Sequence, residues 1–287
     1  MNVQNKLAPT TILHILLYAL SYAGLWATVR SLAQEIHPLV LVFYRTVFGT
    51  LLIMPLFFKG GFQSLKIDQL TLYTLRGVLS ISTMFLTFFA LSHIPLADAV
   101  AYSYLSPIFA IVLAAFFLNE RLGRKQFLAI CIAFIGAVTL LRPDFQTINI
   151  GILASLGAAL GFAGTLICMK LLTRKDSPKL VAIYGYIIPL PLSLMFAMPY
   201  WQWPGSLQIW GLLLLMSLLS VIAHLSMTHA LSRADIGAIL PFDFIRLIFA
   251  AALGIVLFQD ALDWISLVGG TIILAASIMS SHQQVKQ

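Results

Sequence analysis

Long apolar segments, separated by short polar or turn-rich breaks, follow one another along the whole chain. Each segment is close to the roughly 20 residues that a helix needs to cross the hydrocarbon core of a membrane. The pattern therefore predicts an all-α integral membrane protein with ten transmembrane helices. We expect these helices at residues 10–30, 38–58, 70–92, 96–118, 123–141, 149–172, 179–199, 207–231, 236–258 and 264–281.

The composition agrees with a membrane protein. The 287 residues are 60% hydrophobic and 9% charged, whereas about 25% of the residues of a soluble domain are charged. The first apolar run, free of charged residues from Leu7 to Val29, is too long for a signal-peptide core, so we expect it to be retained. Cys131 and Cys168 both lie inside apolar runs, which argues against disulfides and paired-cysteine metal sites. We expect neither a metal nor a cofactor.

Basic residues collect on one side of the predicted membrane. With ten helices both termini share a side, and twelve of the 17 Lys and Arg residues fall there, whereas only Arg30 and Arg142 fall on the other. The positive-inside rule then places both termini in the cytoplasm of a bacterial inner membrane. The charges are spread over several short loops, so we expect the lipid bilayer and no nucleic acid as a partner. The twelve residues are Lys6, Lys59, Lys66, Arg121, Arg124, Lys125, Lys170, Arg174, Lys175, Lys179, Arg233 and Lys286.

The two halves of the chain resemble each other at an offset of 140 residues, with no gap. This offset superposes the first five predicted helices on the second five and predicts two repeats, residues 1–142 and 143–287. Five is an odd number, so the second repeat enters the membrane from the opposite side, as in the inverted repeats of secondary transporters. Matched pairs are Ala19 and Ala159, Gly24 and Gly164, Tyr44 and Tyr184, Ser80 and Ser220, and Phe109 and Phe249.

The ten helices in two halves, and the segment LSHIPLADAVAYSYLSPIFAIVLAAFFLNERLGRKQFLAICIAFIGAVTLL (91–141) with its counterpart from Leu231, resemble the EamA-type family of the drug/metabolite transporter superfamily. The most specific matches are the turn at 107–109 and Asn119-Glu120-Arg121. The second half departs from the family pattern, with Gln259-Asp260-Ala261 in place of glycine–glutamate. The segment PFDFIRLIFAA (241–251) also resembles a branch with S-adenosylmethionine and riboflavin uptake carriers. The resemblance implies a metabolite carrier.

The ninth predicted helix holds the first candidate site. Pro241, Asp243 and Arg246 lie in its middle third, where an Asp or Arg costs about 2.5–3.5 kcal/mol on insertion scales. Such residues normally face a bundle interior or a water-filled cavity. Two interpretations stay open: the charges bind a substrate, or they neutralise each other as a structural ion pair, because they are three residues apart.

Polar stripes at helical spacing extend the candidate site to other helices. Residues four apart share a helical face, and the offset of 140 aligns the stripe of the fourth helix with that of the ninth. The alternative for each stripe is hydrogen bonding between helices. The stripe residues are Asp98, Tyr102 and Ser106 in the fourth helix, Phe242 and Arg246 in the ninth, Ser220, His224 and Thr228 in the eighth, and Arg76 and Ser80 in the third.

Arg45, beside Tyr44, and Arg76 are further cations within predicted helices. Either side chain could extend to the membrane interface. If both face the centre with Arg246, they form a positive chamber that accepts a carboxylate-bearing or zwitterionic metabolite, since a guanidinium grips a carboxylate as a fork. Proton coupling through His224 or Asp98 is a secondary hypothesis, and His224 suits it because histidine titrates near neutral pH.

The sequence thus favours an alternating-access transporter of a small-molecule metabolite. The lead substrate is similar to S-adenosylmethionine and is taken up, and the alternative is export of amino acids or related metabolites. A channel and a membrane enzyme are rivals, but the chain contains neither HExxH nor GxSxG, the motifs of two common hydrolase classes. Import or export, the energy source and the oligomeric state, monomer or homodimer, are left open.

Overall fold

The computed structural model describes residues 8–58, 69–91, 93, 102–119, 123–141, 150–259 and 264–282. Within these ranges the protein is helical and contains no strand. The helices are α1 (Pro9–Leu32), α2 (Pro38–Phe58), α3 (Leu70–Leu91), α5 (Ser106–Leu118), α6 (Arg124–Leu141), α7 (Ile150–Thr173), α8 (Pro178–Ile187), α9 (Pro189–Ala197), the 3₁₀ turn η2 (Met198–Tyr200), α10 (Leu207–Arg233), α11 (Ile236–Asp243), α12 (Ile245–Phe258) and α13 (Trp264–His282).

Seven segments of the described chain are long and apolar enough to cross a membrane, which makes this a multi-span membrane protein. Two of them, Pro178–Tyr200 and Ile236–Phe258, each combine consecutive shorter helices. Three shorter apolar helices accompany the seven spans, namely Ser106–Leu118, Phe127–Thr139 and Leu267–Ala276. The ten-helix count stays a prediction.

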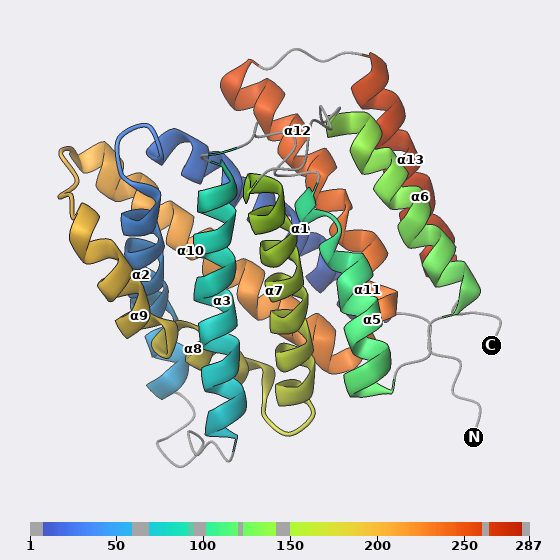
Figure 1. Cartoon of the computed structure of the whole chain (residues 1–287), viewed down its shortest axis with the longest axis horizontal. Coiled ribbons are helices and arrows are strands. Elements are labelled where there is room, and N and C mark those ends of the chain that lie inside the picture. Colours follow the sequence, from blue (N-terminus) through green and yellow to red (C-terminus); the bar gives the residue numbers. More distant parts are fainter. Residues whose placement is uncertain are drawn as a thin grey trace.

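Helices from the two halves of the chain pack against each other in pairs. The most extensive pairings in the described structure are α1 with α10, α3 with α7, and α6 with α13. Figure 1 shows α3 beside α7 and α6 beside α13. Small residues allow the close approach of α7 to α3, because a Cβ at Gly157 would lie 3.2 Å from Leu86 and one at Gly161 would press on Thr83.

Turns lie at two positions related by an offset of 140. The predicted ninth helix keeps its span but is broken at Phe244, between α11 and α12. In the first half, a turn at Tyr104 precedes α5. The rings of Tyr104 and Phe244 are both buried, and their centroids lie 5.2 Å apart. The same offset relates Asn119 and Gln259, which end α5 and α12 with left-handed φ values of 54° and 56°.

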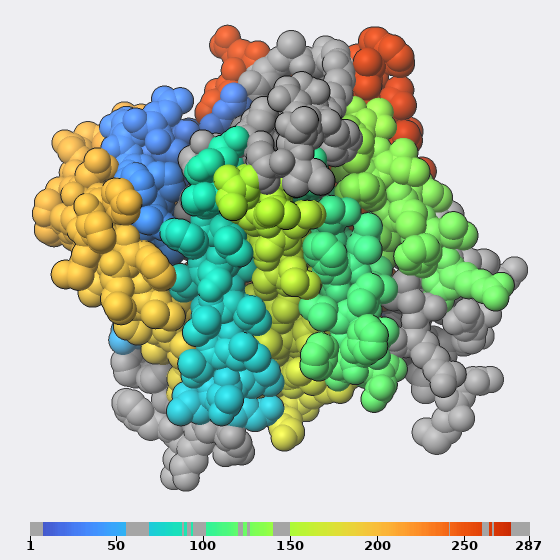
Figure 2. All heavy atoms as spheres, viewed as in Figure 1, coloured from blue at the N-terminus to red at the C-terminus, as the bar shows by residue number. Residues whose placement is uncertain are grey.

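Apolar side chains cover the outer face of the bundle. The face seen in Figure 2 is formed largely by α3, α7 and α5, from left to right. Its helices expose large hydrophobic side chains, as expected where the solvent is lipid rather than water. Examples are Phe85 on α3, Leu153 and Leu160 on α7, and Phe116 and Phe117 on α5.

Candidate functional site

One polar centre, the tyrosine–arginine cluster, forms around the break between α11 and α12. Arg246 Nη2 lies 3.4 Å from Asp243 Oδ2, and Asp243 is 2% exposed. Arg246 Nε donates a hydrogen bond to the Tyr104 hydroxyl (3.2 Å), and Nη1 donates one to the Tyr18 hydroxyl (3.4 Å). The guanidinium carbon also lies 4.7 Å from the ring centroid of Tyr22, in cation–π contact. Three tyrosines therefore enclose a buried ion pair.

Helix packing brings these tyrosines together. Tyr18 and Tyr22 are four residues apart and share a face of α1, which packs along α12. Tyr104 comes from the turn before α5 and reaches Arg246 across the bundle. The Oδ1 atom of Asp243 is buried and has no hydrogen-bond partner in the described structure. This carboxylate therefore has capacity for one more donor.

A second polar centre, the arginine–histidine cluster, consists of Arg45, Arg76, Tyr186, Ser220 and His224. Arg76, on α3, is 2% exposed, so it does not extend to the membrane interface. Its guanidinium contacts Nε2 of His224 on α10. The Tyr186 ring on α8 lies 5.3 Å from the His224 ring, and its hydroxyl is 2.7 Å from Ser220 Oγ. Arg45 lies four residues before Gly49 and so shares the face of α2 that rests against the Tyr186 ring.

Glycines make room for this cluster. A Cβ at Gly185 would lie 2.7 Å from Arg76 Nη2, so the guanidinium rests against the α8 backbone, where its Nη1 donates to the Val181 carbonyl (2.6 Å). A Cβ at Gly49 would collide with the Tyr186 ring. Because a guanidinium can only donate, Nε2 of His224 is the acceptor and carries no proton in this arrangement. Protonating it would place two cations in contact, which disfavours His224 as a proton carrier here.

Tyr22, on α1, extends the first centre through its cation–π contact with Arg246. Tyr22, Arg45, His224 and Arg246 are each only partly buried in the middle of the bundle. α1, which carries Tyr18 and Tyr22, packs along α10, which carries Ser220 and His224, so the two centres lie on neighbouring helices.

Other predicted site residues lie elsewhere. Tyr44 belongs to an aromatic group with Trp201 and Trp210, and its hydroxyl donates to the Gln202 carbonyl (3.3 Å). The Ser80 hydroxyl bonds the Arg76 carbonyl of its own helix. The Thr228 hydroxyl likewise bonds the backbone of α10, at His224 and Leu225. The Ser80 and Thr228 hydroxyls therefore bond backbone groups of their own helices.

The fourth-helix stripe is only partly described. Ser106 is buried at the start of α5, and Tyr102 packs with Ile152 and Leu156 of α7. Phe242 lies in the apolar core beside α1 and α7. Asp98 lies outside the described residues.

Four tyrosines of the two clusters are not among the site residues that the sequence predicts: Tyr18, Tyr22, Tyr104 and Tyr186. A signal existed for Tyr18 and Tyr22, because their spacing of four puts them on one helical face. No local pattern marks Tyr104 or Tyr186, since their partners are distant in sequence. Within the described chain, no three His, Cys, Asp or Glu side chains gather as a metal site.

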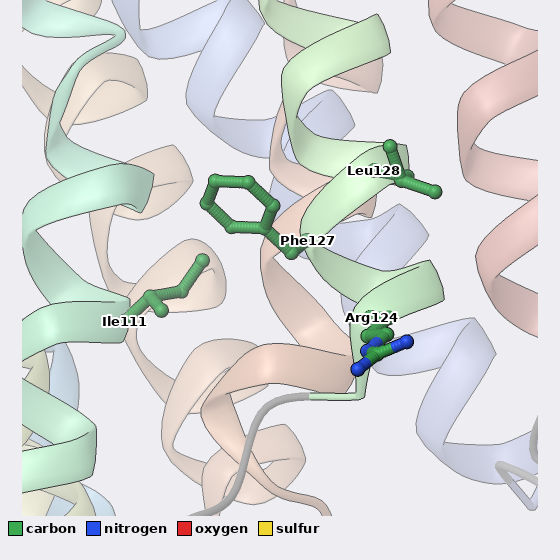
Figure 3. A pocket seen from close by; sticks show the side chains of 4 residues that line it. All are labelled: Ile111, Arg124, Phe127 and Leu128. Atoms are coloured by element: carbon green, nitrogen blue, oxygen red, sulfur yellow. The ribbon is translucent and has the colours of Figure 1, made fainter.

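A pocket of about 470 Å³ opens between α5 and α6, away from both clusters. Ile111 of α5 and Phe127 of α6 face each other across it, with Arg124 at one end (Figure 3). Leu128 completes the lining. The pocket shares no residue with the predicted site.

A multi-span helical bundle with charged and aromatic side chains buried at its centre is the architecture of a membrane transporter. The chain belongs to the EamA-like transporter family, which it matches over residues 9–142 and 149–282. It is 25% identical to the pseudopaline exporter of Pseudomonas aeruginosa, over 94% of this chain and 95% of that one. It is 28% identical to the S-adenosylmethionine uptake transporter of Rickettsia felis, over 90% and 87%. A solved crystal structure shares its fold, with a TM-score of 0.82, 18% identity and coverage of 97% and 98%.

Proposed function

We propose that this membrane transporter is an alternating-access carrier built from two inverted five-helix repeats, residues 1–142 and 143–287. The two family matches begin at residues 9 and 149, which are 140 apart, and this supports the repeat. The packing supports it too. An offset of 140 relates α1 to α7 and α3 to α10. The packing of α1 against α10 therefore has its repeat counterpart in the packing of α7 against α3, and both pairings are present.

The buried Asp243–Arg246 pair is the observation that carries the proposal. It lies inside a membrane span, at a helix interruption, and three tyrosines surround it. Charges at such a depth are costly and are kept mainly where they serve a binding site or a structural pair. The interruption at Phe244 is also similar to the broken helices that line transporter sites.

The proposed substrate is a small zwitterionic or carboxylate-bearing metabolite, with uptake of an S-adenosylmethionine-like compound as the lead. The tyrosine rings suit a sulfonium cation and a planar base. The free Oδ1 of Asp243 suits an ammonium group, and a guanidinium suits a carboxylate. The name of the Rickettsia relative supports this substrate.

Export of an amino acid or related metabolite is the second candidate, because the Pseudomonas relative is named an exporter. In both cases we place the protein in the bacterial inner membrane, with ten spans and cytoplasmic termini. The excess of Lys and Arg on one side supports this orientation.

Counterflow in proteoliposomes tests the proposal. The panel contains S-adenosylmethionine, riboflavin, and aromatic and basic amino acids, and each is measured with wild type and Arg246→Gln. We expect saturable S-adenosylmethionine exchange by the wild type and its loss in the variant, because Arg246 organises the tyrosine–arginine cluster. Exchange of amino acids alone would favour the second candidate. Equal exchange by both proteins would remove the cluster from the binding site.

A further inference from the structure

The arginine–histidine cluster contains two cations without a described counter-charge. Within the described ranges, neither Arg45 nor Arg76 has a carboxylate at ion-pair distance, whereas Arg246 has Asp243. The Nε atoms of Arg45 and Arg76 are both buried and have no hydrogen-bond partner there. Each of the two guanidiniums therefore has an N–H donor without an acceptor in the described part of the protein.

Neutral neighbours do not cancel the positive charge. Arg76 donates to the Val181 carbonyl and contacts the unprotonated Nε2 of His224. Tyr186 and Ser220 bond each other. A buried charge without a partner is strongly unfavourable in a membrane interior, so its retention indicates a function.

The cluster also has the shape of a built site. Gly185 lets the guanidinium of Arg76 lie against the α8 backbone, because a Cβ there would lie 3.1 Å from its Cζ. Arg45 lies on the face of α2 that Gly49 brings against the Tyr186 ring, and it is only partly buried. The side chains of this positively charged cluster thus come from four helices, α2, α3, α8 and α10.

We propose that Arg45 and Arg76 form a carboxylate subsite, separate from the Asp243–Arg246 pair. A carboxylate oxygen replaces His224 Nε2 as the acceptor for Arg76, and the other oxygen accepts from Arg45. Arg246 keeps its ion pair with Asp243, and the tyrosines around it hold the rest of the substrate. This inference rests on the proposed function and assigns the two ends of the substrate to two clusters.

The test compares two probes that differ only in the carboxylate, S-adenosylmethionine and decarboxylated S-adenosylmethionine. The full-length protein is reconstituted in liposomes, and the KM for exchange is measured for each probe. The variant is Arg45→Gln, because Arg45 is less buried than Arg76. We expect its KM for S-adenosylmethionine to rise tenfold or more, while its KM for the decarboxylated probe stays within twofold of wild type.

Arg233→Gln is the matched control. It removes one exposed arginine at the end of α10, whose described hydrogen bond is to Thr10. We expect it to behave as wild type with both probes. The subsite would be overturned if Arg45→Gln raised the KM of both probes equally, or if the ratio of the two KM values stayed as in the wild type.

If the wild type exchanges neither probe, the substrate proposed above is wrong, and the subsite is tested by unfolding of the purified protein. The midpoint is compared in sodium acetate and in sodium chloride at equal ionic strength. Acetate that raises the midpoint of wild type and Arg233→Gln, but not of Arg45→Gln, supports the subsite. The same effect of acetate on all three proteins, or no effect on any, refutes it.

Discussion

The ion pair between Asp243 and Arg246 can be tested by removing each charge alone and then both together. Asp243→Asn leaves a buried guanidinium without its counter-charge, and Arg246→Gln leaves a carboxylate that is 2% exposed. The double variant has neither charge and keeps side chains of similar size. We expect each single variant to lose more stability than the double variant does.

The structure sets the magnitude. Opposite unit charges 3.4 Å apart attract by about 5 kcal/mol at an effective dielectric constant of about 20. Removing one partner of a buried pair typically costs about 3–5 kcal/mol, whereas replacing the whole pair is often close to neutral. Tyr18 and Tyr104 still hold hydrogen bonds to Arg246 when Asp243 is changed, so Asp243→Asn belongs at the lower end of this range.

Unfolding of the purified protein in detergent micelles, followed by tryptophan fluorescence, measures the four free energies of the cycle. Since the double variant should lose less stability than either single variant, the coupling between the two positions should exceed the larger single effect, which is about 3–5 kcal/mol. Additive effects of the two single changes would refute the view that these charges stabilise each other. Ser106→Ala, a buried hydroxyl outside the cluster, is the control for a small polar change in a neighbouring helix.

Two further predictions concern other parts of the chain. Gly185→Ala forces Arg76 away from α8 and should cost about 1–3 kcal/mol of stability together with exchange activity. Gly211→Ala, inside α10 with open space around it, should leave exchange activity unchanged and raise stability by about 0.4–1 kcal/mol. Burial lowers the pKa of His37, in the loop before α2, where Nδ1 accepts from the Leu39 amide. Its contribution to stability is therefore present above the unfolded pKa of about 6.5 and lost as the pH falls through the folded pKa. The difference in unfolding midpoint between wild type and His37→Gln should shrink from pH 7 to pH 5, and a constant difference would contradict this assignment.

The sequence was sufficient for features that depend on local spacing. Apolar length predicted the seven spans found in the described chain, and a separation of three residues predicted that Asp243 and Arg246 can pair. The resemblance of residues 91–141 to EamA-type carriers predicted the family. Each of these signals lies within one helix or one repeat.

Features that depend on packing between distant helices were beyond sequence reasoning. Tyr104 bonds Arg246, and Arg76 fits against Gly185, only because helices from opposite halves meet. Tyr44 and Arg45 are adjacent in sequence, yet successive residues on a helix are about 100° apart. Tyr44 therefore joins the aromatic group near Gln202, whereas Arg45 joins the arginine–histidine cluster.

The pairing of α1 with α10, α3 with α7 and α6 with α13 bears on how the protein is made. Each of these helices finds its most extensive partner in the other half of the chain. During synthesis the first half therefore enters the membrane before its main packing partners exist. Helices α1, α3 and α6 lack these neighbours until the second half has been inserted. The two repeats are units of sequence rather than of folding, and separately expressed halves should become stable only when both are present in the same cell.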